Sequence, residues 1–175
     1  MIVCHCDTSS VNNFEYFLSN CTSLTTLNLS NFNTLSVVNM AGMFSNCNSL
    51  ISLDLSNFDT SKVLNMAYLF VNCFSLTSIN ISNFSASICA LESRMFYKCY
   101  SLKSLDLSSF NTKSVIYMVA MFYDCKELRE LNLSNFETSF RGNFNYLFYG
   151  CNRLVSLDIL NFDMSQSSDM IDIFL

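Results

Sequence analysis

Apolar and polar positions recur along this chain with a period of 26 residues and no gap. Each unit carries a cysteine at the same position: Cys21, Cys47, Cys73, Cys99, Cys125 and Cys151. Two phenylalanine columns keep the same register: Phe32, Phe58, Phe84, Phe110, Phe136 and Phe162, and then Phe44, Phe70, Phe96, Phe122, Phe148 and Phe174. Such a period indicates a stack of similar units that bury their apolar sides against one another.

The first half of each unit predicts a short strand. In the unit that begins at Cys47, Leu53 and Leu55 alternate with the polar residues Asp54 and Ser56. A period of two places the leucines on one face of a strand and the polar residues on the other. The same triplet occurs in the other units, so neighbouring strands are expected to pair in parallel about 4.8 Å apart.

The second half of each unit predicts a short helix. Apolar residues follow at helical spacing over 63–70, after Asp59 or Thr60, either of which can act as a helix N-cap. The residue before each cysteine is Asn20, Asn46, Asn72, Lys98, Asp124 or Gly150, and all but the lysine tolerate the left-handed conformation that ends a helix. Since packed helices need about 8–10 Å, more than the strand spacing, we expect a curved α/β solenoid with strands on the concave face and helices on the convex face.

The register extends to both ends of the chain. We therefore predict one solenoid domain over 1–175, with nearly seven coils that begin near 1, 21, 47, 73, 99, 125 and 151. Solenoids normally need polar capping units, and no unit here is polar enough to cap an end. We expect both ends to be uncapped and the chain to be a fragment of a longer array. The alternatives are a chain that has lost its caps, or ends covered by a partner or by end-to-end self-association.

The strand segment carries a family resemblance. Residues 50–58 resemble the leucine-rich repeat pattern L-x-x-L-x-L-x-x-N, with Phe58 in the asparagine position. The longer unit over 104–125 is similar to the BspA-type leucine-rich repeats of bacterial surface proteins, especially the mycoplasma and Gram-positive variety. This likeness covers the whole chain. It implies a cell-surface or secreted protein that acts in adhesion or host contact through protein–protein interaction.

Composition narrows the partners. The net charge is −5 and the nine basic residues are scattered, whereas nucleic-acid binding needs a clustered basic face. No segment reaches the roughly 18 uninterrupted apolar residues of a membrane helix, so we expect no membrane insertion. The start over 1–6 lacks the basic and apolar regions of a signal peptide. A surface location therefore rests on the resemblance alone.

The periodic cysteines are expected to be buried and reduced, as small apolar fillers of a cysteine ladder. One thiol per coil does not give the converging C-x-x-C spacing of a metal site. Parallel side chains rarely meet the dihedral requirement of a disulfide, and Cys4, Cys6 and Cys89 bring the total to an odd nine. Cys4-His5-Cys6 is too short to hold zinc alone. We expect no metal and no cofactor.

Two surfaces are candidate binding sites. The outward strand position alternates between amide and carboxylate: Asn28, Asp54, Asn80, Asp106, Asn132 and Asp158. This row is either a self-satisfying ladder or the floor of a binding face for a basic partner or a cation. A second column holds Tyr97, Tyr123 and Tyr149, with Phe74 and Tyr100 in a neighbouring one. These aromatic residues either cover the edge between helix and strand or contact a partner.

Catalysis finds little support, because the chain has one histidine, no glycine-rich phosphate loop and no nucleophile with a base at motif spacing. An active site also needs one unique constellation, and this chain repeats similar ones. We therefore expect a non-enzymatic, adhesive module that binds a host or cell-surface protein. The alternative is a structural spacer, or a gene-remnant fragment of a larger repeat protein, with no ligand of its own.

Overall fold

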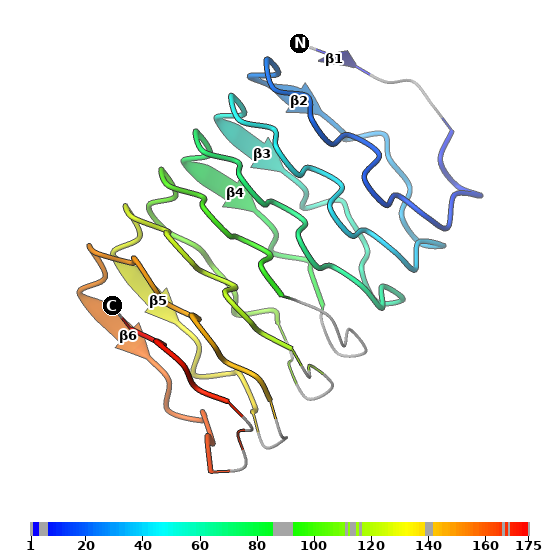
Figure 1. Ribbon diagram of the computed structural model, residues 1–175. Coiled ribbons are helices and arrows are strands. Elements are labelled where there is room, and N and C mark those ends of the chain that lie inside the picture. The colour runs from blue at the N-terminus through cyan, green and yellow to red at the C-terminus, as the bar shows by residue number, and fades with distance from the viewer. Residues whose placement is uncertain are drawn as a thin grey trace.

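The computed structural model describes residues 2–3, 7–85, 93–110, 112, 115, 117–138, 142–165, 167 and 169–174. The chain winds into a stack of coils in which each coil lies on the one before it (Figure 1). The described strands are short and lie along one side of the stack: β1 (Ile2–Val3), β2 (Leu27–Asn28), β3 (Ser52–Asp54), β4 (Ser78–Asn80), β5 (Glu130–Asn132) and β6 (Ser156–Asp158). The predicted architecture of parallel strands on a repeating coil is confirmed.

The strands pair in parallel in the register that the repeat predicts. Leu53 pairs with Ile79 and Leu131 pairs with Leu157, each at an offset of 26 residues. The pairing of β1 with β2 differs, because Val3 pairs with Asn28 at an offset of 25. The first strand is therefore shifted by one residue relative to the sequence repeat.

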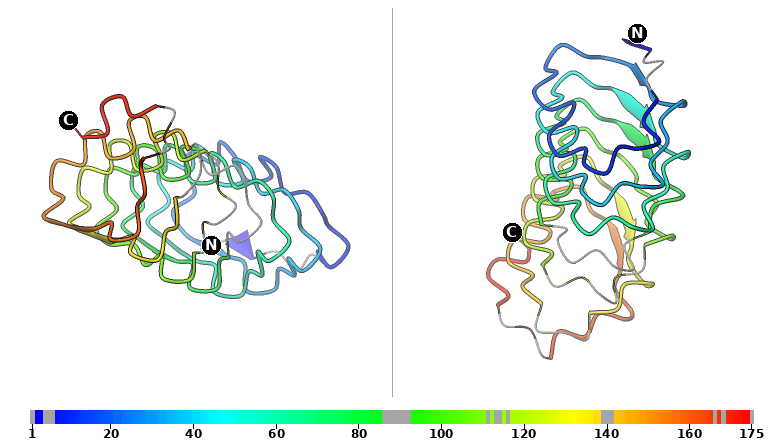
Figure 2. Two further views of the ribbon diagram at one scale, coloured as in Figure 1. Left: turned by 90° about the horizontal axis from the view of Figure 1, so that it is seen from below. Right: turned by 90° about the vertical axis from the view of Figure 1, so that its right-hand side faces the viewer.

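The predicted helices are wrong for the described residues, in which no helix occurs. The segment opposite the strands is a series of turns, which Figure 2 shows on the other side of the stack. Alternate amides here donate to carbonyl oxygens of the next coil, as from Met40 to Asn65 at 3.0 Å and from Phe44 to Leu69 at 3.0 Å. Because the next coil takes up these amides, they are not available for helical bonds within their own coil.

The turn segment also removes the physical basis of the predicted curvature. That prediction assumed helices that are wider than strands. Both sides of the stack instead carry backbone hydrogen bonds between successive coils, such as Leu55 to Asn80 at 2.9 Å on the strand side. The spacing between coils is then set by the same kind of bond on both sides.

Each coil but the last has two residues with positive φ on the turn side. The residue before each periodic cysteine has φ between 58° and 74°, which confirms the left-handed conformation predicted there. The second position lies four residues earlier and carries unrelated residue types: Tyr16, Gly42, Tyr68, Arg94, Ala120, Tyr146 and Asp172. Left-handed backbone costs roughly 1–2 kcal/mol for a residue with a Cβ. The hydrogen bonds between coils hold it in place.

The core consists of ladders that run along the stack. Phe44 and Phe70 stack at 5.5 Å between ring centroids, and Phe110 and Phe136 stack at 6.4 Å. Cys73 and Cys99 are fully buried beside them. Both predicted phenylalanine columns are core columns, although Phe174 in the last coil is 55% exposed. Coils therefore bury one another's apolar side chains, as repeat architectures require.

Candidate functional site

The outward residues of the strands form a single exposed row, named here the asparagine–aspartate row. It contains the six residues predicted from the sequence, and all of them are exposed: Asn28, Asp54, Asn80, Asp106, Asn132 and Asp158. In each, the side-chain Oδ1 accepts the amide N–H of the residue two positions later, at 2.9–3.3 Å. The row is therefore ordered by local turns at the ends of the strands.

These local bonds favour the charged form of Asp54 and Asp106. Hydrogen bonds from Ser56 hold the pKa of Asp54 below its usual value, with a smaller contribution from the side chain of Asn80. Ser108 lowers the pKa of Asp106 in the same way. The side chains of the row thus bond mainly to the backbone of their own coil. Bonds between neighbouring coils, which the ladder interpretation assumed, contribute less.

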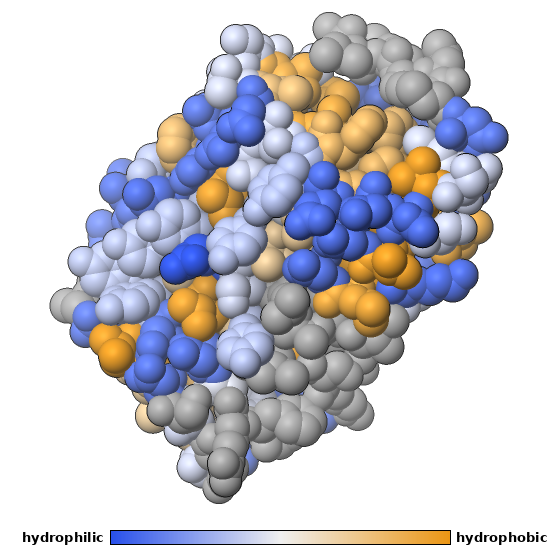
Figure 3. All heavy atoms as spheres, turned by 45° about the vertical axis from the view of Figure 1, so that its right-hand side comes forward, coloured by the Kyte–Doolittle hydropathy of each residue, from blue (hydrophilic) through white to orange (hydrophobic). Residues whose placement is uncertain are grey.

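The predicted tyrosine column lies on the turn side as a continuous stack. The rings of Tyr97 and Tyr123 stack at 4.7 Å, and those of Tyr123 and Tyr149 at 4.8 Å. Tyr146 stands across this stack, with its ring at 68° to Tyr123 and 75° to Tyr149. Phe74 and Tyr100 stack at 5.0 Å in the neighbouring column. Figure 3 shows part of this side, where blue hydrophilic residues gather next to pale ones of intermediate hydropathy.

Beside the stack is an open hollow of about 380 Å³, named here the tyrosine hollow. It is lined by Arg94, Tyr97, Ala120, Tyr123, Tyr146, Tyr149 and Asp172. The sequence repeat placed the column of Tyr97, Tyr123 and Tyr149 but not the residues opposite it. Those belong to the second positive-φ position, whose residue types share no signal.

Basic side chains lie over aromatic rings near this hollow. The Lys98 Nζ is 5.3 Å from the ring centroid of Tyr97, and the Lys126 Nζ is 4.7 Å from that of Tyr100. The nearby Tyr97 and Tyr100 side chains raise the pKa of Lys98. These contacts are cation–π interactions, worth about 0.5–1 kcal/mol each at exposed sites.

The periodic cysteines are free thiols, and four of the six are buried. They also form hydrogen bonds that the sequence did not predict. The Cys73 Sγ donates to the carbonyl oxygen of Phe44 at 3.2 Å, and the Cys125 Sγ donates to that of Phe96 at 3.3 Å. Burial raises the pKa of Cys47 to about 11. Burial therefore favours the protonated form of the buried thiols.

Across the described residues, no group of three or more histidine, cysteine, aspartate or glutamate residues is placed to hold a metal ion. Cys4, His5, Cys6 and Cys89 lie outside the described residues. The described residues contain no helix that could cross a membrane.

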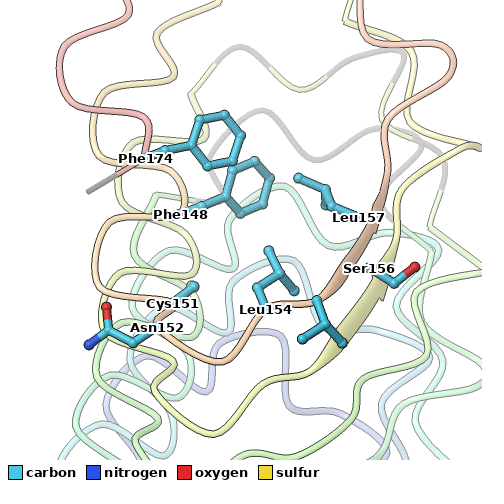
Figure 4. A pocket seen from close by; sticks show the side chains of 8 residues that line it. Phe148, Cys151, Asn152, Leu154, Ser156, Leu157 and Phe174 are labelled. Carbon is cyan, nitrogen blue, oxygen red and sulfur yellow. The ribbon is translucent and has the colours of Figure 1, made fainter.

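A third surface is the apolar hollow of the last described coil, of about 430 Å³. Figure 4 shows Phe148, Phe174, Leu154 and Leu157 around it, with Cys151 and Asn152 at one side. These side chains occupy the core columns of the stack, and Phe174 stacks on Phe148 at 5.3 Å. The hollow thus lies against the core ladders in the last described coil.

Comparison with solved structures supports the fold. A leucine-rich repeat protein from Bacteroides ovatus matches 92% of this chain at 18% identity with a TM-score of 0.53, and the chain spans 43% of that protein. The leucine-rich repeat protein TpLRR of T. pallidum matches 83% of the chain at 22% identity with a TM-score of 0.48, over 72% of its own length. The first likeness shows a leucine-rich repeat fold and no more.

Sequence comparison supplies the family. No curated protein matches the chain significantly. The family described as "Mycoplasma protein of unknown function, DUF285" matches residues 2–104 and 76–175, and thus nearly the whole chain. Together with the coiled fold, this match confirms the expected BspA-type resemblance. The chain is therefore a leucine-rich repeat protein that belongs to the DUF285 family.

Proposed function

We propose that this chain is a non-enzymatic, protein-binding and adhesive repeat module of a surface protein. The observation that carries the proposal is the asparagine–aspartate row. Its six side chains are exposed, and each is fixed by a hydrogen bond to its own backbone. A face that is already ordered loses little side-chain entropy when a partner binds, which favours recognition.

The charge of the row indicates the kind of partner. Asp54, Asp106 and Asp158 lie in alternate coils, about 10 Å apart by the strand spacing. Each has a second carboxylate oxygen beyond the one that accepts the local amide. The row therefore presents charged acceptors at regular intervals to a protein surface with basic side chains. Electrostatic complementarity of this kind guides association and specificity.

The test removes the charges without removing the turns. Asparagine keeps the Oδ1 acceptor, and Asn80 shows that a coil accepts it at this position. In the variant Asp54→Asn, Asp106→Asn, Asp158→Asn, we expect an unchanged fold and weaker saturable binding of the fluorescently labelled chain to cultured animal cells. Far-UV circular dichroism and thermal unfolding check that the variant folds.

The chain offers a matched control. Asp7, Asp59 and Asp163 also accept the amide of the residue two positions later, but they lie outside the row. Their triple asparagine variant carries the same change in net charge. If both triple variants weaken binding equally, the row has no special role. If neither the parent chain nor a variant binds saturably, the spacer interpretation replaces this proposal.

We also propose end-to-end self-association through the apolar hollow of the last coil. The support is the exposure of Phe174 at the end of a core ladder. The variant Phe174→Ser should reduce concentration-dependent association in sedimentation velocity. Ile51→Ser, which alters a residue of similar exposure within the stack, is the control. A parent chain that sediments as a monomer at all concentrations would refute this proposal.

A further inference from the structure

The tyrosine hollow combines two aromatic surfaces with charged groups at its rim. One surface is the stack of Tyr123 and Tyr149, and the other is the ring of Tyr146, which stands at a steep angle to both. Ala120 lies at the floor and is almost fully buried. A planar group that enters here meets aromatic carbon from two directions.

Arg94, which also lines the hollow, is held on the preceding coil by a neutral side chain and keeps its positive charge. The Arg94 guanidinium lies 5.8 Å from the ring centroid of Tyr68, and its Nη1 donates to the Tyr68 hydroxyl at 3.3 Å. Arg94 is therefore bound to the preceding coil. An anion that entered the hollow would have to compete with Tyr68 for this guanidinium.

The negative charge at the rim is available. Asp172 is exposed and lines the same hollow. Within the described part of the chain, its carboxylate takes part in no hydrogen bond or ion pair. The chain as a whole carries a net charge of −5. The hollow thus offers a ligand one carboxylate that is unpaired among the described residues and several aromatic rings, next to an arginine that is held on the preceding coil.

We propose that the tyrosine hollow binds an arginine side chain of a partner protein. A guanidinium is planar, stacks on aromatic rings and forms paired hydrogen bonds with a carboxylate. Tyr146 supplies the ring and Asp172 the carboxylate. A lysine ammonium is compact and more strongly hydrated, so it fits this arrangement less well. This site lies on the turn side and is independent of the asparagine–aspartate row.

The proposal can be tested with small peptides and the full chain. The probes are acetyl-Gly-Arg-Gly-amide and the same peptide with citrulline, which has nearly the shape of arginine but no charge. Ring resonances of the eight tyrosines report the site by NMR. We expect the arginine peptide to shift the resonances of Tyr123, Tyr146 and Tyr149 saturably. The citrulline peptide should bind at least about fivefold more weakly.

Three variants locate the site. Asp172→Asn should weaken arginine binding about fivefold, because the charge of the carboxylate is lost at nearly constant shape. Ala120→Tyr should abolish binding by filling the hollow. Its backbone already has φ of 54°, close to the values at Tyr68 and Tyr146, so a tyrosine adds no new backbone strain. Asp59→Asn, which lies outside both the tyrosine hollow and the asparagine–aspartate row, is the control and should leave binding unchanged.

Four outcomes would overturn the proposal: equal binding of both peptides, full binding to Asp172→Asn, full binding to Ala120→Tyr, or preference for an acidic peptide. Circular dichroism and thermal unfolding confirm that each variant is folded. The outcome is separable from that of the proposed function. In the triple variant of Asp54, Asp106 and Asp158, the arginine peptide should shift the resonances of the hollow's tyrosines as it does in the parent chain.

Discussion

The hydroxyl of Thr34 is bonded twice to the backbone of Asp59 in the next coil. Its Oγ1 donates to the Asp59 carbonyl oxygen at 2.9 Å and accepts the Asp59 amide N–H at 2.8 Å. Thr112 makes the same pair of bonds with Glu137. Both threonines are almost fully buried. A buried hydroxyl thus pairs one backbone N–H and one backbone carbonyl of the next coil, at the place where the chain passes from the strand side to the turn side.

The first prediction concerns this threonine. Thr34→Val keeps the shape but leaves the amide and carbonyl of Asp59 without the partner they have in the parent chain. An unpaired buried polar group costs about 1–3 kcal/mol, so we expect the free energy of unfolding to fall by at least about 1 kcal/mol. Urea unfolding measures it. Thr26→Val, at an exposed position, should change stability by less than half as much.

The second prediction concerns alkaline pH. Burial raises the pKa of Cys47 to about 11 and of Cys151 to about 12, and holds that of Cys99 well above its usual 9.0. Unfolded thiols ionise as pH rises through about 9, while folded thiols stay protonated. The unfolded state then binds fewer protons than the folded state. The contribution of these thiols to the free energy of unfolding is therefore fully present below pH 9 and is lost as the pH rises above it.

For each such thiol, the free energy of unfolding should fall by up to about 1.4 kcal/mol per pH unit once the thiol is ionised in the unfolded state. Urea unfolding between pH 8.0 and 9.8 measures the slope. The variant Cys99→Ala is less stable overall. Its free energy of unfolding should fall less steeply with pH, because one buried thiol is absent. Stability that stays constant over this range would contradict protonated, buried thiols.

The third prediction concerns Gly150. Its φ is +74°, and an added Cβ would lie 2.4 Å from the Asp124 Oδ1 and 3.3 Å from the Asp124 Cα. Gly150→Ala should therefore destabilise the fold by about 1–2 kcal/mol. The matched control is Lys98→Ala at the equivalent position, where φ is 60° and a side chain is already present. A smaller loss in Gly150→Ala than in Lys98→Ala would contradict the strain.

Much of the fold could be predicted from the repeat. A period of two around Leu53 indicated a strand with this residue inward, and Leu53 is buried. A constant column of phenylalanines indicated a core ladder, and Phe44 and Phe70 stack with nearly parallel rings. Asn46 and Asn72 before the cysteines indicated left-handed backbone, and both have it. Each of these features depends on the residue type at one position of the repeat, so the sequence of a single unit is enough to predict it.

The path of the turn side could not be predicted in the same way. Residues 63–70 have the apolar spacing of a helix, but their conformation depends on amides and carbonyls of neighbouring coils. Tyr68 and Ala120 have positive φ for the same reason, and neither side chain favours it. The tyrosine hollow depends on this position, so only three of its seven lining residues were foreseeable. Threonine recurs at four equivalents of Thr34, whereas the last unit has Met164: Thr8, Thr60, Thr112 and Thr138. Thr60 was interpreted as a helix N-cap, and its hydrogen bonds to the next coil were not foreseen.

The last prediction concerns the asparagine that neighbours Phe58. The repeat pattern placed Phe58 in the asparagine position, yet Phe58 is in the core and Asn57 forms the polar bonds. The Asn57 Nδ2 donates to the carbonyl oxygens of Leu29 at 3.0 Å and Phe32 at 3.2 Å in the preceding coil. Asn57→Asp replaces this donor with a charged acceptor that faces two carbonyl oxygens. It should destabilise the fold more than Asn57→Ala, which costs about 1 kcal/mol.

Urea unfolding of the two variants at pH 7 measures this difference. Asn152→Asp is the control, because Asn152 is exposed and its side chain forms no hydrogen bond within the described residues. That substitution should change stability little. Equal losses for Asn57→Ala and Asn57→Asp would show that the amide acts by packing alone, since removal of a donor and introduction of a repulsive acceptor differ only in electrostatics.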